Sequence, residues 1–189
     1  SNFDVFLVID DTEKYYGKSF KGINVFQMPD ESCGFYKNCA YIENATQLKK
    51  NPTAWDKFLL HFCENLNYDF VWVFEDDVFI PSVDTIINLH KKYSEFDLVT
   101  ANNFFKNDNV LDWHWLKIID KIEPPYYYSM VCAMGISGRC LKEIKKYAHD
   151  NESLFYHEVM FNTIAMQKGL SVMAAFELRS VVWKGRWDI

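Results

Sequence analysis

Apolar and polar positions follow one another in blocks, in an order typical of strands that alternate with helices. The stretch FDVFLVID, residues 3–10, is a nearly continuous apolar run that ends in acids, which predicts a strand buried on both faces. Apolar residues recur at helical spacing from Trp55 to Leu66, with Asn51 as the expected cap and Pro52 in the first turn. The same reading predicts further strands at 23–28, 70–74, 96–101, 130–137 and 170–176, and further helices at 82–92, 139–149 and 157–169.

This order of elements predicts an α/β fold with a mostly parallel central sheet, flanked by helices on both faces. The 189 residues fit one domain, residues 1–189, and the abrupt end after WKGRWDI fits a domain cut from a longer polypeptide. Residues 102–128 form a long segment rich in Asn, Trp and Tyr, and loops of this length in compact domains are usually functional or flexible.

Composition narrows the possible functions. The apolar content of 49% and the aromatic content of 17% exclude a disordered chain. A net charge of −6 without a dense Lys/Arg cluster argues against a nucleic-acid partner. No apolar stretch approaches the length of a membrane span. Five cysteines with no CxxC motif, and no targeting segment, predict reduced thiols in a cytoplasmic protein.

The stretch DFVWVFEDDVFIP, residues 69–81, carries the most specific chemical signal. Glu75, Asp76 and Asp77 interrupt an apolar strand, where adjacent carboxylates repel one another and are costly to bury. A divalent cation would neutralise them, and oxygen ligands without Cys or His in the motif favour Mg²⁺ or Mn²⁺ over zinc. Because such a metal keeps open positions that phosphate oxygens can fill, a diphosphate substrate is the expected partner. The alternative is that these acids simply end the strand.

The sequence VWVFEDDVFI resembles the metal-binding motif of GT-A glycosyltransferases, which use nucleotide-sugar donors and commonly carry D-x-D or E-D-D at this point. The order of elements around the motif is similar over most of the chain, and is also similar to glycosyltransferase domains encoded by large algal (chlorella) viruses. For a viral protein, the expected location is the host cytoplasm. The resemblance implies that Asp77 binds the metal, and that Asp76 or Glu75 completes the metal shell or contacts the donor ribose.

Two further acids follow the first predicted strand. Asp10 and Asp11 resemble the family's nucleotide-binding edge, where base and ribose are held. In a parallel sheet the ends of the first strand and of the E-D-D strand lie along the same edge, where ligands bind. The alternative for Asp10 is a capping box with Glu13 at the start of a helix.

Glu158, in LFYHEVMF, matches the place where inverting members of the family put a general base, which takes the proton of the acceptor hydroxyl. The alternative is an ordinary glutamate in a first helical turn. In the family the chain's end often folds over the diphosphate, which would give Lys184 and Arg186 a role in neutralising phosphate. A solvated surface explains these two cations equally well.

Aromatic residues of the long segment are the expected acceptor site. Trp113, Trp115 and Tyr127 offer rings on which the C–H faces of a sugar can stack, although core packing accounts for many such rings. Gly135 and Gly138 indicate a close approach of the backbone to a ligand or to a neighbouring element.

The leading hypothesis is a glycosyltransferase that uses Mn²⁺ or Mg²⁺ to pass a sugar from a UDP-sugar donor to a hydroxyl of a glycan acceptor. Inversion is favoured because Glu158 offers a base, whereas a retaining reaction has no dedicated base to recognise and stays open. A magnesium-dependent phosphohydrolase also gathers acids at strand ends. A sugar-binding domain without catalysis is the third alternative.

Overall fold

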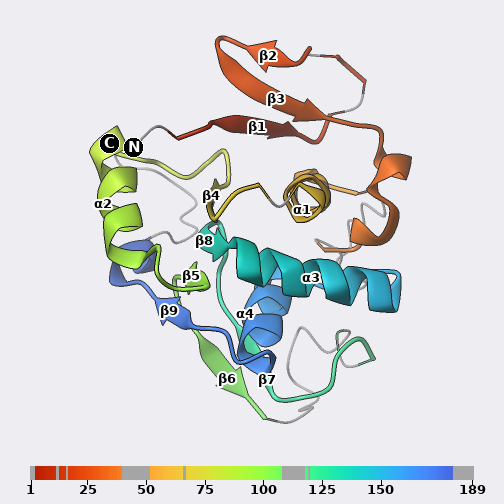
Figure 1. The fold of residues 1–189 in the computed structure, drawn as a ribbon, viewed down its shortest axis with the longest axis vertical. Coiled ribbons are helices and arrows are strands. Elements are labelled where there is room, and N and C mark those ends of the chain that lie inside the picture. Colours follow the sequence, from red (N-terminus) through yellow and green to blue (C-terminus); the bar gives the residue numbers. More distant parts are fainter. Residues whose placement is uncertain are drawn as a thin grey trace.

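The computed structural model describes residues 3–11, 13–15, 17–39, 52–65, 67–107, 118 and 120–180 (Figure 1). The strands are β1 (Phe6–Ile9), β2 (Ser19–Phe20), β3 (Ile23–Gln27), β4 (Phe70–Phe74), β5 (Leu98–Thr100), β6 (Phe104–Lys106), β7 (Tyr126–Tyr128), β8 (Ala133–Ser137) and β9 (Val172–Ala174). The α-helices are α1 (Ala54–Glu64), α2 (Val83–Tyr93), α3 (Gly138–Asn151) and α4 (His157–Gln167), and the 3₁₀ helices are η1 (Asp30–Tyr36) and η3 (Phe176–Ser180). The expected α/β class is confirmed.

The largest sheet in the described residues has four strands in the order β4-β8-β5-β9. β8 runs antiparallel to both β4 and β5, and only β5 and β9 are parallel. The expectation of a mostly parallel central sheet is therefore not met. The reason is the route of the chain, because β8 follows the long segment after β5 and enters the sheet from the edge at which β4 and β5 end.

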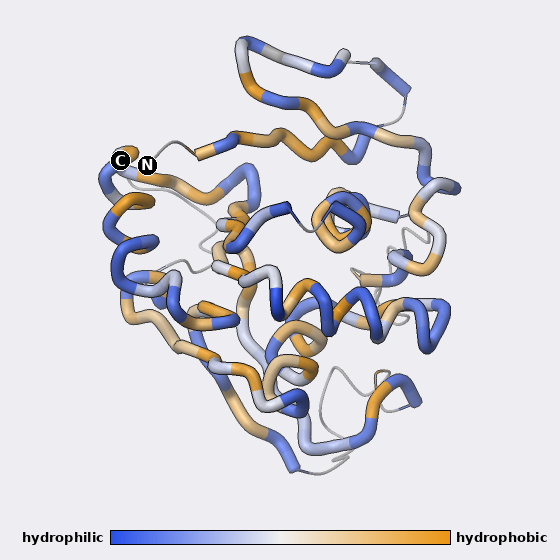
Figure 2. The backbone as a smooth tube through the Cα atoms, in the orientation of Figure 1, coloured by the Kyte–Doolittle hydropathy of each residue, from blue (hydrophilic) through white to orange (hydrophobic). Residues whose placement is uncertain are grey.

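Side chains of this sheet alternate between two apolar clusters, one on each face. Val71, Leu98 and Ile136 pack with α1, α3 and α4, while Trp72 and Val99 pack with α2 and η3. Helices thus cover both faces, as expected. In Figure 2, α2 alternates between hydrophilic and hydrophobic colours, as does a helix with one face on a sheet.

Gly135 makes room for the aromatic rings of β4. It pairs with Trp72 across the sheet, and a Cβ at residue 135 would lie 2.6 Å from Cζ of Phe70 and 3.1 Å from Cζ3 of Trp72. Gly138 is equally confined, because a Cβ there would lie 2.8 Å from the carbonyl oxygen of Tyr68. Both glycines allow a neighbouring element to come close, which was one of the two readings of the sequence.

A smaller sheet of order β1-β3-β2 lies against α1, which separates it from α3 in Figure 1. Phe6 and Phe26 contact His61 of α1, with ring centroids 5.4 and 4.2 Å apart. Leu7 follows Phe6 in β1, so its side chain lies on the opposite face of the strand, and it is 40% exposed. The prediction that the first strand is buried on both faces is therefore wrong. An apolar run of this length does not distinguish one covered face from two.

α1 begins at Ala54, later than the sequence predicts. Thr53, rather than Asn51, is the N-cap, and its backbone N–H donates to the Asp56 carboxylate at 2.8 Å in a capping box.

The long segment after β5 contains the antiparallel ribbon β6-β7. Thr163 of α4 accepts the backbone N–H of Tyr127 at 2.9 Å, which fastens this ribbon to α4.

Asp97 joins three elements at the amino end of β5. Its buried carboxylate accepts the Ser137 hydroxyl at 2.9 Å, Arg139 Nε–H at 2.7 Å, and the backbone N–H and hydroxyl of Ser171 at 2.9 and 2.8 Å. Although burial alone would raise its pKa, the hydrogen bonds from Arg139, Ser171 and Ser137 lower it to about 2. Asp97 therefore stabilises the fold in its ionised form.

Replacing Asp97 by asparagine should lower the free energy of unfolding by about 2 kcal/mol at neutral pH, because the charged form is favoured only in the folded state. A carboxyl group whose pKa is lowered by folding contributes above its unfolded pKa of about 3.9, and the contribution disappears as pH falls toward 2. Urea unfolding of wild type and Asp97→Asn between pH 7 and pH 2 should show the difference shrinking with acid. Glu95→Gln, at an exposed position two residues away, is the control. A difference that is constant with pH would contradict the assignment.

Candidate functional site

The candidate site lies at the edge of the four-stranded sheet where β4 ends. Glu75 is the first residue after β4, and its backbone N–H donates to the carbonyl of Cys132, just before β8, at 2.8 Å. Asp76 and Asp77 follow in a turn, which the hydrogen bond from Val78 N–H to the Glu75 carbonyl closes at 3.1 Å. The antiparallel direction of β8 thus places its beginning against the acids.

The three adjacent acids have different surroundings. Glu75 is half-buried, and its carboxylate accepts the indole N–H of Trp55 at 2.9 Å and a hydrogen bond from the Cys132 thiol. Asp76 and Asp77 are exposed. The cost of placing three carboxylates at a strand end is reduced because one is hydrogen-bonded inside and two reach solvent.

Glu158 comes to the same edge from the first turn of α4. Its carbonyl accepts the backbone N–H of Ser129 at 3.0 Å, while its carboxyl group makes no hydrogen bond with other described residues. Burial, and then the charge of Glu75, raise its pKa to about 7. The charges of Glu75, Glu158 and Asp77 all raise the pKa of the Cys132 thiol, after burial, to about 12. Ser129, which bonds to the Glu158 carbonyl, and Cys132, which bonds to the Glu75 N–H, lie on the one short segment that leads into β8.

His157 fixes the start of α4. Its backbone N–H and its ring nitrogen Nδ1 lie 2.6 and 3.0 Å from the carbonyl oxygen of Cys39, and its imidazole stacks on the Trp55 indole with ring centroids 4.9 Å apart. Burial lowers its pKa to about 4, so the imidazole is neutral at physiological pH. His157 is therefore a structural neighbour of Glu158 and adds no charge.

Asp10 belongs to a separate polar cluster at the end of β1. The ammonium group of Lys57, which is 0% exposed, donates to the Asp10 carbonyl at 2.7 Å and lies 3.7 Å from its carboxylate and 2.9 Å from that of Asp30. Glu13 lies in a bend, so the reading of Asp10 as a helix cap is wrong, and the Glu13 N–H instead bonds to the Asp11 carboxylate at 2.8 Å. Lys57 and Trp55 share the first turn of α1, which connects this cluster to the strand-end acids.

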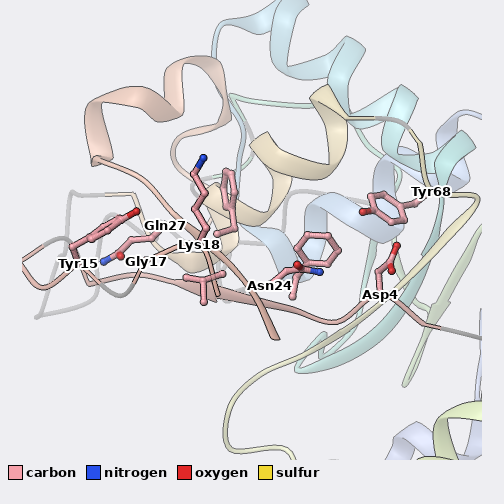
Figure 3. Close-up of a pocket in the computed structure, with 10 residues that line it drawn as sticks. Asp4, Tyr15, Gly17, Lys18, Asn24, Gln27 and Tyr68 are labelled. Atoms are coloured by element: carbon pink, nitrogen blue, oxygen red, sulfur yellow. The ribbon is translucent and has the colours of Figure 1, made fainter. Parts of the chain in front are cut away.

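A groove of about 510 Å³ lies along the smaller sheet (Figure 3). It contains none of the residues that the sequence predicted for the site; its lining residues include Asp4, Tyr15, Lys18, Asn24, Gln27 and Tyr68. The Gln27 amide donates to the carbonyls of Asp11 and Lys14, so one wall of the groove also fixes the backbone that follows β1.

The remaining predicted residues are described in part. Tyr127 lies in β7, half-buried, with its ring centroid 5.3 Å from that of Phe105, which is 57% exposed. Aromatic surface is therefore present on the β6-β7 ribbon. Trp113, Trp115, Lys184 and Arg186 lie outside the described residues.

The acids are compatible with a hard cation that is also coordinated by substrate. Among the described residues, no group of three His, Cys, Asp or Glu side chains is arranged to hold a metal by itself. The exposed carboxylates of Asp76 and Asp77 provide two ligands, and Mg²⁺ is commonly bound by one or two carboxylates together with phosphate oxygens and water. Glu75 is less suited, because its carboxylate is already engaged by Trp55 and Cys132.

Sequence reasoning missed Trp55, Lys57 and Cys132. Trp55 read as one more member of an apolar helical stripe, and only the proximity of its N–H to an acid identifies a polar role. Nothing in the spacing marks Lys57 as buried. Cys132 was part of an apolar strand, and its position beside Glu75 depends on the antiparallel pairing of β8.

Comparison with known proteins does not place the chain in a group. No family model, curated protein sequence or solved structure matches it significantly. In the described part of the chain, none of the helices has the length and apolar character needed to cross a membrane.

Replacing Glu75 by glutamine should lower the pKa of Glu158 from about 7 toward that of an ordinary glutamate, because the neighbouring charge is removed while burial remains. Carbon-13 NMR of the glutamate carboxyl groups, with Glu158 assigned by its loss in Glu158→Gln, measures this titration. Asp84→Asn, an exposed acid in the first turn of α2, is the matched control and should leave it unchanged. An unaltered Glu158 titration in Glu75→Gln would show that the two carboxyls do not interact.

Proposed function

We propose that the chain is a metal-dependent glycosyltransferase, which transfers a sugar from a UDP-sugar donor to a hydroxyl group of a glycan acceptor. The observation that carries the proposal is the position of Glu158 beside the acids that follow β4. One carboxyl group there is half-buried and without a hydrogen-bond partner in the described residues, while Asp76 and Asp77 face solvent. A proton acceptor and a cation-binding pair at one edge are what glycosyl transfer from a diphosphate requires.

Glu158 is suited to act as the base of an inverting transfer. As the acceptor oxygen forms its bond to the anomeric carbon, the carboxylate takes the hydroxyl proton, and the bond to the diphosphate breaks with its electron pair on the phosphate oxygen. A carboxylate with a pKa of about 7 accepts a proton more readily than an ordinary one and is still ionised in part at neutral pH. Mn²⁺ or Mg²⁺ held by Asp76 and Asp77 would supply positive charge to the departing diphosphate.

Donor binding should depend on metal and on Asp77. Isothermal titration of UDP into wild type is expected to give affinity at least tenfold higher with Mn²⁺ than without it, because the carboxylates alone repel the diphosphate. Asp77→Ala should lose this gain, whereas Asp84→Ala should keep it, since Asp84 is an exposed acid on α2. Equal binding of UDP with and without Mn²⁺ would remove the basis of the metal assignment.

Glu158→Gln should lower kcat for sugar transfer by about a hundredfold or more, since removal of a general base typically costs that much, and should leave UDP–Mn²⁺ affinity within twofold. In wild type, kcat should rise with pH through about 7 as the carboxyl loses its proton. The assay is UDP release from a panel of UDP-sugars, with acceptor glycans and with water as acceptor.

Further measurements distinguish the alternatives. Inorganic phosphate released from UDP without any sugar acceptor would indicate a phosphohydrolase. UDP binding without turnover, unaffected by Glu158→Gln, would indicate a sugar-binding domain without catalysis. The anomeric configuration of the product distinguishes inversion from retention.

A further inference from the structure

Trp55 contacts both halves of the candidate site from the first turn of α1. Its indole N–H donates to Oε1 of Glu75 at 2.9 Å, and its ring stacks on the imidazole of His157, with planes inclined by 24°. His157 immediately precedes Glu158 in α4. One side chain therefore connects the acid that ends β4 to the helix that carries the proposed base.

Packing restricts the Trp55 ring to this position. Phe58, on the same helix, meets it edge-on at 6.0 Å, and Phe161, one turn after His157 in α4, lies at 5.8 Å. With rings on several sides, the indole has little freedom to follow a carboxylate that moves. Glu75 is consequently held where the indole N–H points.

The starts of α1 and α4 are also fastened to a common segment. Asp56, next to Trp55, accepts the backbone N–H of Cys39 at 2.7 Å, and the His157 N–H donates to the Cys39 carbonyl at 2.6 Å. The two helix starts are therefore held at a fixed separation on one side of Trp55. Its indole extends this rigid arrangement to the end of β4.

We infer that Trp55 is a positioning residue of the proposed reaction: it fixes the Glu75 carboxylate and sets the separation between the end of β4 and Glu158. This inference rests on the proposed glycosyltransferase function. Hydrogen bonds to an ionised acceptor are among the stronger ones in proteins, which suits a contact that must outweigh the tendency of a carboxylate to seek water.

The chain offers a matched control for the loss of an indole N–H. Trp72 lies in β4, and its Nε1 is buried without a hydrogen-bond partner among the described residues. Trp55→Phe and Trp72→Phe both replace an indole by a smaller ring, but only the first removes a hydrogen bond to the site.

Kinetics of sugar transfer test the role of the contact. Trp55→Phe should lower kcat by about tenfold or more, as expected for the loss of a hydrogen bond to a charged group, and leave KM for the donor and UDP–Mn²⁺ affinity within twofold. Trp72→Phe should leave kcat unchanged. In a Glu75→Ala background, Trp55→Phe should cause no further loss, because its effect acts through Glu75. An equal loss in that background, or in Trp72→Phe, would overturn the inference.

A measurement without substrate separates this inference from the proposed function. The ¹H–¹⁵N resonance of the Trp55 indole, assigned by its absence in Trp55→Phe, should shift in Glu75→Ala and stay in place in Asp76→Ala. No shift in Glu75→Ala overturns the inference whatever the donor experiments give. If the shift is seen but wild type neither binds UDP nor releases it from any UDP-sugar, the proposed function fails, and with it the role of Trp55 in catalysis, while the contact itself stands.

Discussion

The antiparallel insertion of β8 between β4 and β5 is the constraint on which the candidate site depends. At one end of this strand, the Gly138 N–H bonds to the Asp69 carbonyl at 2.9 Å, and at the other the Glu75 N–H bonds to the Cys132 carbonyl at 2.8 Å. Pairing is thus complete along β4, so the chain leaves the sheet directly after Phe74. The acids emerge at a defined point, with the Cys132 thiol beside them.

The second requirement is that a helix start reaches the same point. α4 is held by Asn162, which is fully buried and donates to the carbonyl of Asn102 and the side chains of Thr100 and Asn103 at 2.9 to 3.2 Å. These contacts attach α4 to the end of β5 and to the segment that follows it. Because β5 ends at the same edge as β4, Glu158 is brought to the acids by the topology of the sheet rather than by any contact of its own carboxyl group.

The sequence predicted most elements because their apolar periods are clear. β3 and β4 lie where the apolar runs placed them, and α2 and α4 begin at or next to the first residues of the predicted ranges. Strand direction is different, because a fully apolar run reads the same either way. The antiparallel β8 and the one-sided burial of β1 were therefore outside the reach of pattern analysis.

Prediction of the site was limited in the same way. Acids that end an apolar run are recognisable, so Glu75 and Asp77 could be selected, whereas Glu158 was selected through the resemblance to a known family. The structure brings Glu158 to the same edge of the sheet, where its carbonyl accepts the Ser129 N–H and the Glu75 N–H bonds to the Cys132 carbonyl. Trp55, which bonds to Glu75, and Lys57, which bonds to Asp10 and Asp30, lie on a helix enclosed by the smaller sheet, η1 and α3. A helix enclosed on several sides has no broad polar face. The spacing of apolar and polar residues along α1 therefore does not show that Lys57 is buried rather than solvated.

The two ends of the four-stranded sheet differ in how far their carboxylates are hydrogen-bonded. At the amino end of β5, hydroxyl, guanidinium and backbone N–H donors satisfy the single carboxylate of Asp97. At the opposite end, the acids after β4 and Glu158 offer far more acceptor oxygens than Trp55 and Cys132 can satisfy. At one end of the sheet, the protein's own donors fill the acceptor capacity of the carboxylate. At the other end, the carboxylates keep acceptor oxygens that a proton, a cation or a ligand can bind.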